Sequence, residues 1–281
     1  MLKNDLHERT WFFDLEWVPD AVGAKRLYDL PDTTTELEAM EEIWKNAAGF
    51  SETRPRPFVK YLFSRVVSIS FLSRNVVFRD GEKRIDFALH SLPKLPVDPT
   101  ESNEAYIIER FLHFVGERCP QLVGFNSIES DMQVLIQRGL VNEISAPAFC
   151  SRPDKPWEGR DYFAKNENEW HVDLIKHFSN GVMKPRLNEI ARLCGFPGKI
   201  DVHGEQVADL WLQGEHAKIV EYNQIDTLNT YLVWLRFVHF AGKLSEEEYI
   251  TEQDEFRGFL EIEAAKSDKE FLQKFLDRWD I

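Results

Sequence analysis

Acidic residues in three separated segments have the types and spacing of a metal-ion site. Asp14 and Glu16 are two residues apart in an aromatic run, Asp131 follows a short apolar stretch, and Asp226 comes four residues after Tyr222. Hard oxygen ligands of this kind suit magnesium or manganese. Four carboxylates balance the charge of two such ions, which together activate a water and stabilise a leaving oxygen in phosphodiester hydrolysis. The sequence therefore predicts two-metal chemistry on a phosphodiester.

The first two acids lie in a segment with the pattern of a buried strand, TWFFDLEWVPD. Residues two apart on a strand point to the same face, so Asp14 and Glu16 are expected side by side. Two unpaired carboxylates in so apolar a setting are disfavoured, and a bound divalent cation removes that cost. The alternative is a strand end where both acids reach water or an arginine. The other two segments favour the metal site.

Asp131 is expected at the beginning of a helix. A short strand, 122–125, follows Pro120, and Asn126 marks its end. Apolar residues then recur at helical spacing, which puts Asp131 near the C-terminal edge of a sheet, where α/β sites lie. Taken alone, Asp131 would serve equally well as a helix-capping acid, and Asn126 as a turn residue.

The third segment predicts a long helix, His216 to Phe240, without Pro or Gly. Tyr222 and Asp226 are four apart and share one face of it. A tyrosine hydroxyl beside a metal-bound carboxylate would orient the attacking water or the scissile phosphate. The alternative is a core tyrosine next to a solvated aspartate.

The order D-x-E, N-x4-D, Y-x3-D resembles the DEDD superfamily of 3'-5' exonucleases, in its tyrosine-bearing subclass. The closer likeness is to predicted exonucleases related to the proofreading domain of family B DNA polymerases. It is carried by residues 193–237, LCGFPGKIDVHGEQVADLWLQGEHAKIVEYNQIDTLNTYLVWLRF, with HVDLIKH and VVSISF. The likeness covers roughly residues 8–240. The histidine-bearing subclass would place its histidine at Glu221, so the tyrosine subclass is preferred.

The resemblance implies an α/β, RNase H-like fold and metal-dependent removal of 3'-terminal nucleotides. It also implies a catalytic set of four ligands for two Mg²⁺ or Mn²⁺ ions, with a tyrosine that orients the water: Asp14, Glu16, Asp131, Asp226 and Tyr222. The chain departs from the family pattern between Asn126 and Asp131, which reads Ser-Ile-Glu-Ser, where Glu129 adds an acid. This departure concerns substrate fit more than metal binding.

Charge is distributed unevenly along the chain. The formal net charge is −14, and residues 241–281 hold 12 acids against 6 bases. Basic residues gather in two stretches that we expect to contact substrate phosphates, with Asn126 beside them. These stretches hold Arg54, Arg56, Lys60 and Arg65, and then Lys184, Arg186, Arg192 and Lys199. Solvated surface charge is the alternative for each of them.

Composition indicates a globular protein. The chain has 281 residues, 43% of them hydrophobic, which is enough to bury a substantial core. Its three cysteines lack metal-ligand spacing and are expected to be reduced. We find no signal-peptide pattern and no apolar run that would span a membrane, so we expect a cytoplasmic protein.

The remaining pattern predicts a five-stranded mixed sheet with the first strand at its centre and helices on both faces. Strands are expected at 59–73 and 83–90 around a turn at Asp80-Gly81, a helix at 103–118, and a last strand at 170–174 carrying a fifth acid, Asp173. Residues 32–50 predict an acidic helix that we interpret as decoration rather than a lid. Trp157, Tyr162 and Phe163 would stack on bases or simply anchor a long loop.

We divide the chain into an exonuclease domain, 1–240, and a C-terminal helical extension, 241–281. Ser245 begins one helix of the extension, and a second follows a break near 266–268. Their apolar faces are expected to pack on the parent domain, and self-association or a partner protein is the alternative.

The sequence thus predicts a metal-dependent 3'-5' exonuclease acting on single-stranded ends, with DNA favoured over RNA. One alternative is an exonuclease for RNA or small oligonucleotides. The other is a non-catalytic nucleic-acid-binding scaffold. The intact five-residue set speaks against the scaffold, because such a protein has no physical need for four converging carboxylates.

Overall fold

The structure is a computed structural model that describes residues 6–155, 158–164, 169–179, 181–200, 204–266 and 269–279. Trp157 and the break at 267–268 between the two expected C-terminal helices lie outside these ranges. Among the described residues, no helix is both long and apolar enough to cross a membrane.

Five strands form one mixed sheet in the order β3-β2-β1-β4-β5. β2 pairs antiparallel with β1 and with β3, whereas β4 pairs parallel with β1 and β5 pairs parallel with β4. The bounds are β1 Arg9–Pro19, β2 Ser64–Arg79, β3 Glu82–Leu92, β4 Gln121–Gly124 and β5 His171–Asp173. The expected five-stranded mixed sheet, with the first strand at its centre, is confirmed.

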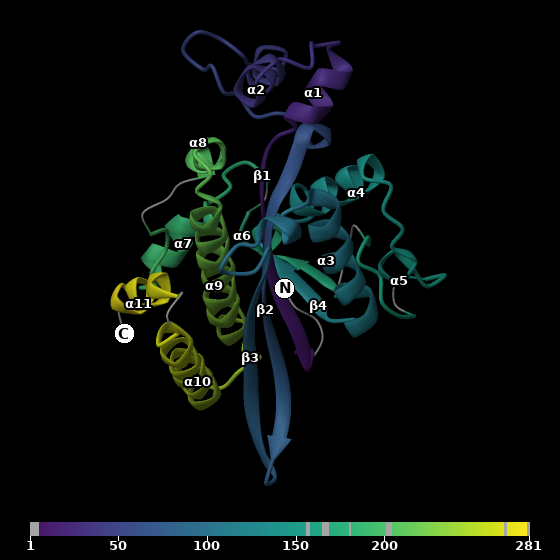
Figure 1. The fold of residues 1–281 in the computed structure, drawn as a ribbon. Helices are drawn as coiled ribbons and strands as arrows, with labels where there is room; N and C mark the ends of the chain where they lie inside the picture. The colour runs from purple at the N-terminus through teal and green to yellow at the C-terminus, as the bar shows by residue number, and fades with distance from the viewer. Residues whose placement is uncertain are drawn as a thin grey trace.

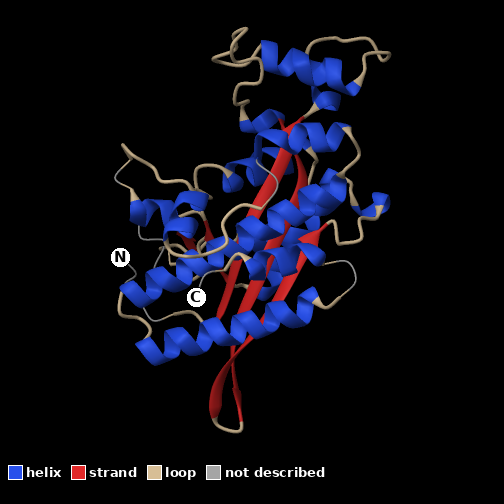
Figure 2. Ribbon diagram, turned by 90° about the vertical axis from the view of Figure 1, so that its left-hand side faces the viewer, coloured by secondary structure: helices blue, strands red, loops and turns tan. Residues whose placement is uncertain are grey.

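Helices cover both faces of the sheet because β1 is apolar on both (Figures 1 and 2). Phe12 packs into a core with α9, while Trp11 and Phe13 pack into another with α3. The second face is covered by α3 (Glu104–Arg118), α4 (Asp131–Val141) and α5 (Pro147–Cys150). The α9 face carries α6 (Leu174–Phe178), α7 (Leu187–Leu193), α9 (His216–Phe240), α10 (Glu246–Ala264) and α11 (Glu270–Asp277).

The second strand differs from the sequence prediction. Residues 59–63 are not strand: Tyr61–Phe63 form a short 3₁₀ helix, η1, because the Leu62 carbonyl accepts a hydrogen bond from the Arg138 guanidinium at 2.7 Å. Further on, β2 extends to Arg79 because it pairs along its length with β3. The expected turn is confirmed at Asp80 and Gly81, whose φ values of 53° and 84° suit a tight hairpin.

The insertion after β1 contains two helices where one was expected. Thr35 and Glu38 form a capping box that begins α2 (Glu36–Lys45). Before it, Asp20 caps α1 (Ala21–Leu27) by accepting from the Gly23 N–H. Both helices pack beyond the end of β1 (Figure 1), in a core with α8 (Val207–Leu212) and the side chain of Tyr222.

The two C-terminal helices pack on the rest of the chain, as the favoured interpretation expected. Their apolar side chains share one core with α9. A buried ion pair ties α10 to β2: the Arg74 guanidinium donates to both Glu252 carboxylate oxygens at 2.6 and 2.7 Å. Tyr231 of α9 donates to the same carboxylate at 3.1 Å. Residues 246–277 are therefore integral to the packed core wherever the structure describes them.

Candidate active site

Three of the predicted ligands converge where α9 crosses the central strand. Asp14 and Glu16 lie on the α9 face of β1, and one carboxylate oxygen from each lies within 4.8 Å of the others and of one from Asp226. The period of two along β1 and the position of Asp226 on α9 produce this meeting. A β-bulge directly after Glu16 shifts the register with β2, a feature often found beside active sites.

Asp131 begins α4, as predicted, but its carboxylate is turned toward the backbone. One oxygen accepts from the Leu15 N–H at 3.1 Å, and the other accepts from the Ser130 hydroxyl at 2.5 Å. Leu15 lies between Asp14 and Glu16 in the sequence, so this hydrogen bond holds Asp131 next to the segment that carries both acids. The tight turn before α4 requires Gly124, since a Cβ there would lie 2.3 Å from the Ser127 hydroxyl oxygen.

Buried carboxyl groups of the site have raised pKa values. Burial raises the pKa of the Asp14 carboxyl well above its usual range, and the charges of Asp131, Glu16 and Asp226 raise it further. Burial and the Asp226 charge likewise raise the pKa of Glu16. Burial also raises the pKa of Asp131 to about 6. Each of these pKa shifts favours the protonated carboxyl, first because the group is buried and then because other carboxylates lie near it.

Tyr222 and Lys199 close one side of the cluster. The Tyr222 hydroxyl accepts from the Lys199 ammonium at 2.5 Å, and the same ammonium lies 3.8 Å from the Asp226 carboxylate. Burial and the carboxylates of Asp226, Glu16 and Asp14 raise the pKa of Tyr222, so the phenol stays protonated. Lys199 was expected to contact phosphate; the structure puts it beside the proposed ligands.

Asn223 is a site residue that the sequence analysis missed. Its amide donates to Asp14 at 2.7 Å, and its carbonyl oxygen accepts from the Ser68 hydroxyl at 3.0 Å. Asn223 therefore fixes the orientation of one proposed ligand. Its position next to Tyr222 was the available signal, but the contact joins residues 209 positions apart.

The rim beside Asp131 carries charge of both signs. Glu129 accepts from Lys176 and Lys184, and these bonds lower its pKa to about 2. Lys184 also donates to the Asn126 side chain at 3.4 Å. Asn126 itself is held by Asp173, which accepts its N–H at 2.7 Å and caps α6. This structural role accounts for the fifth acid.

The other predicted phosphate contacts include Arg54, Arg56, Lys60 and Arg186. Arg56 pairs with Asp209 at 2.7 Å and stacks over the Trp44 ring, so its charge is already compensated. Arg54 is exposed in the loop after α2, Lys60 is exposed just before η1, and Arg186 is exposed at the beginning of α7. Their contacts with substrate remain predictions.

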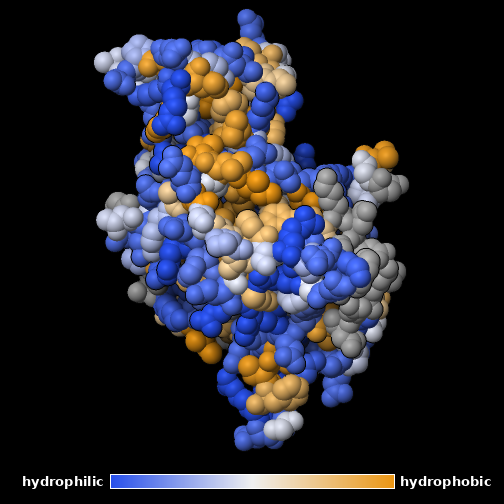
Figure 3. Space-filling view, turned by 90° about the vertical axis from the view of Figure 1, so that its right-hand side faces the viewer, coloured by the Kyte–Doolittle hydropathy of each residue, from blue (hydrophilic) through white to orange (hydrophobic). Residues whose placement is uncertain are grey.

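An aromatic wall, defined as Trp17, Tyr61 and Phe58, adjoins the carboxylates. The Tyr61 ring packs edge-on against both neighbours, 6.3 Å from Trp17 and 5.3 Å from Phe58. Tyr61 belongs to η1, which packs against α4, the helix that begins at Asp131, so the wall lies close to the site. Burial raises the pKa of Tyr61, and the carboxylates of Asp131 and Glu129 raise it further. Phe58 is 58% exposed. Figure 3 shows apolar surface below the α1–α2 region, on the side of the molecule that carries α3 and α4.

Tyr162 and His171 serve the structure. Tyr162 is buried, stacks on Phe149 and donates to the Pro120 carbonyl at 2.7 Å, which confirms the anchoring interpretation for this ring. His171 is buried and lies 2.8 Å from the Ser127 hydroxyl oxygen, and burial lowers its pKa to about 4.

The donor set fits divalent cations. All three converging groups offer hard carboxylate oxygens, which magnesium and manganese prefer. The raised pKa values of Asp14 and Glu16 reflect burial first and repulsion between carboxylates second, and a bound cation would offset both. Asp14, Glu16 and Asp226 are therefore the residues that would hold such ions, with Asp131 adjacent.

A family model for predicted 3'-5' exonucleases related to the exonuclease domain of PolB matches residues 56–279. The chain belongs to this family. Membership agrees with the observed sheet and identifies it as the RNase H-like exonuclease fold. A comparison with curated proteins found no match.

The family match covers some of the proposed site residues and not others. It includes Asp131, Tyr222 and Asp226 and begins after Asp14 and Glu16. The first two acids therefore depend on geometry, which brings them to Asp226 without reference to the family. The match also runs through α10 and α11. Membership implies a nuclease with a nucleic-acid substrate.

Proposed function

We propose that this exonuclease removes nucleotides from single-stranded 3' ends, DNA in preference to RNA, with two Mg²⁺ or Mn²⁺ ions held by Asp14, Glu16, Asp131 and Asp226. The single observation that carries the proposal is the convergence of the first two acids with Asp226 within 4.8 Å. Proteins avoid holding several buried carboxylates together unless a cation or a proton compensates them. The family match supports the reaction class.

The chain's own residues would bind and orient the reacting groups. When bound, the ions supply an activated water and stabilise the departing 3'-oxygen. Asn223 keeps the Asp14 carboxylate aimed at the cluster through its 2.7 Å hydrogen bond. Tyr222 stays a phenol and presents its O–H beside Asp226, where it would orient the attacking water. The Lys199 side chain is a quarter exposed and lies beside Asp226. When bound cations compensate the carboxylates, its ammonium would be available to contact the scissile phosphate.

The surroundings favour an unpaired end. The aromatic wall offers ring faces on which bases would stack irrespective of sequence, and Lys184, which pairs with Glu129 on the rim, would contact a phosphate. The protein's net charge of −14 disfavours long tracking along a duplex, whose binding depends on many phosphate contacts.

Degradation of 5'-labelled single-stranded DNA and RNA, with Mg²⁺ or Mn²⁺ against EDTA, tests the proposal. We expect a ladder that shortens from the 3' end, faster on DNA, and abolished by EDTA. The Asp226→Asn variant should be inactive but folded, and Glu41→Gln, an exposed acid on α2, is the matched control. Faster loss of RNA would correct the substrate, and inactivity on DNA, RNA and short oligonucleotides would favour the scaffold.

A further inference from the structure

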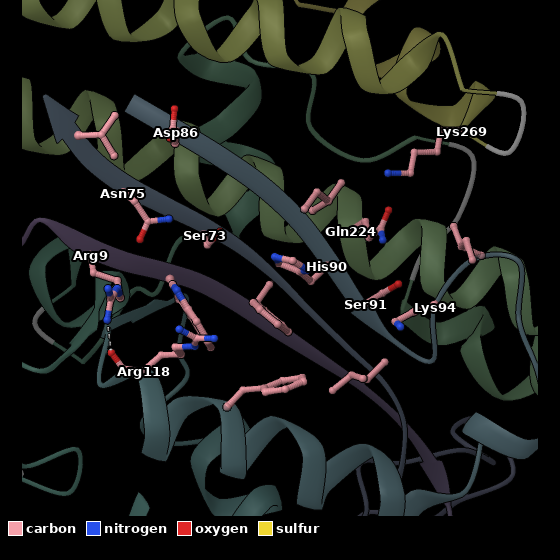
Figure 4. Close-up of a pocket in the computed structure, with 17 residues that line it drawn as sticks. Arg9, Ser73, Asn75, Asp86, His90, Ser91, Lys94, Arg118, Gln224 and Lys269 are labelled. Atoms are coloured by element: carbon pink, nitrogen blue, oxygen red, sulfur yellow. Dashed lines mark hydrogen bonds between the residues drawn. The ribbon is translucent and has the colours of Figure 1, made fainter. Parts of the chain in front are cut away.

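A cavity of about 820 Å³ lies at the edge of the sheet, and none of the proposed metal ligands lines it. Its floor is formed by side chains of β1, β2 and β3 on the α3 face, among them Trp11, Phe71 and Leu92. It continues around the edge strand β3 toward α9 and the segment before α11, where Gln224 and Lys269 reach it (Figure 4). We call it the edge groove.

Three rings stack across the floor, one from each strand. Phe71 stacks on Trp11 at 4.8 Å and 20°, and on His90 at 4.7 Å and 25°. The series ends at His90, which is exposed on the edge strand. No described strand lies beyond β3, and His90 lines the edge groove, so its outer side offers a stacking face to one more planar ring.

Positive charge lies at both ends of the edge groove. Arg9 and Arg118 lie at one end, and Lys94 and Lys269 lie at the other (Figure 4). Arg9 donates to the Arg118 carbonyl at 2.7 Å, whereas Lys269 pairs with Glu263. In the part of the chain that the structure describes, Arg9, Lys94 and Arg118 have no carboxylate partner.

The negative charge of the groove is already compensated. Asp86 is the one acid among the described lining residues, and Arg79 pairs with it at 2.8 Å. In a protein of net charge −14, this surplus of cations suits a polyanion.

Gln224 gives a second, independent indication of a ligand. The side chain is 3% exposed and lines the groove from α9. Its carbonyl oxygen is buried and has no hydrogen-bond partner among the described residues. A buried acceptor without a hydrogen bond costs about 1–3 kcal/mol of stability, and an N–H donated by a ligand would remove that cost.

We propose that the edge groove binds an internal nucleotide of single-stranded nucleic acid. The base stacks on His90 and donates an amino N–H to Gln224, and the flanking phosphates meet Lys94 at one end and Arg9 with Arg118 at the other. Cations at both ends favour a strand over a free nucleotide. The inference takes only its class of ligand from the proposed function, and it adds a binding site separate from the carboxylates.

Fluorescence anisotropy of a labelled mixed-sequence single strand, measured with the full chain in EDTA, tests the site without any cleavage. His90→Ala should weaken binding about tenfold, the loss expected for one base stack. Lys94→Gln, an exposed position that leaves the fold intact, should lower the slope of log K against log salt by about one. Lys45→Gln, equally exposed but on α2, is the matched control and should change neither quantity.

Four other outcomes separate the parts of the inference from one another and from the proposed function. Unchanged binding in both His90→Ala and Lys94→Gln would overturn the edge groove and leave the exonuclease proposal standing. Displacement of the strand by a nucleoside 5'-monophosphate at equal concentration would overturn the assignment to a strand. Equal competition by polyglutamate would overturn base recognition. Normal binding in EDTA with no metal-dependent cleavage would count against the proposed function alone.

Discussion

Replacing Asp14 by asparagine should stabilise the metal-free protein. Carboxylate oxygens of Asp14, Glu16 and Asp226 lie within 4.8 Å of one another. At an effective dielectric constant of about 20, two unit charges at that separation repel by about 3 kcal/mol. Asparagine keeps an oxygen that accepts from Asn223 and removes two such repulsions.

The net gain should be smaller than the summed repulsions. Raised pKa values let part of the charge be neutralised by protons, and Lys199 offsets some of the rest at Asp226. We therefore expect about 1–3 kcal/mol of added stability at pH 8 in EDTA, an increase of roughly 3–8 °C in the unfolding midpoint. Glu41→Gln, which changes the net charge equally at an exposed site, should shift the midpoint by less than about 1 °C.

The pH dependence has a defined sign. The folded pKa of Asp14 lies above its unfolded value, so the ionised carboxylate costs stability above the folded pKa. As pH falls through that pKa, the wild type takes up a proton and the advantage of Asp14→Asn should shrink.

Thermal and urea unfolding at several pH values, with EDTA or Mg²⁺, measure the effect. Mg²⁺ should raise the wild-type midpoint and have little effect on the variant. A variant that is less stable than the wild type in EDTA, or that Mg²⁺ stabilises as strongly as it stabilises the wild type, would show that charge repulsion at Asp14 does not destabilise the metal-free protein.

Three further changes test other parts of the structure. Glu252→Ala should destabilise the protein by about 3–5 kcal/mol in urea unfolding, because it leaves the Arg74 guanidinium buried and unpaired; a loss below about 1 kcal/mol would contradict the integral role of α10. Tyr222→Phe should lower kcat by at least about tenfold with metal affinity unchanged, and an unaltered kcat would remove the hydroxyl from the reaction. Phe58→Ala should raise KM for a single strand about tenfold while stability changes by less than about 0.5 kcal/mol, and an unaltered KM would exclude the aromatic wall from binding.

The sequence predicted those features that local periodicity determines. A period of two put Asp14 and Glu16 on one face of a strand, and helical spacing put Tyr222 and Asp226 on one face of α9. The Asp80–Gly81 turn followed from residue types that tolerate positive φ.

Features set by distant contacts were not predictable in the same way. The 3₁₀ helix at Tyr61–Phe63 depends on Arg138, 76 residues from Leu62. The role of Asn223 depends on Asp14 and Ser68, and Lys199 reached the site through packing of its loop against α9. Single-sequence patterns do not record which distant residues meet, so local propensity could not identify these contacts.

Calorimetric titration of Mn²⁺ into the wild type and Glu16→Gln decides whether these carboxylates form a divalent-metal site. We expect two ions bound per wild-type chain and loss of at least one in the variant, with Glu41→Gln behaving as wild type. Absence of Mn²⁺ binding by the wild type, or identical binding by Glu16→Gln, would contradict it.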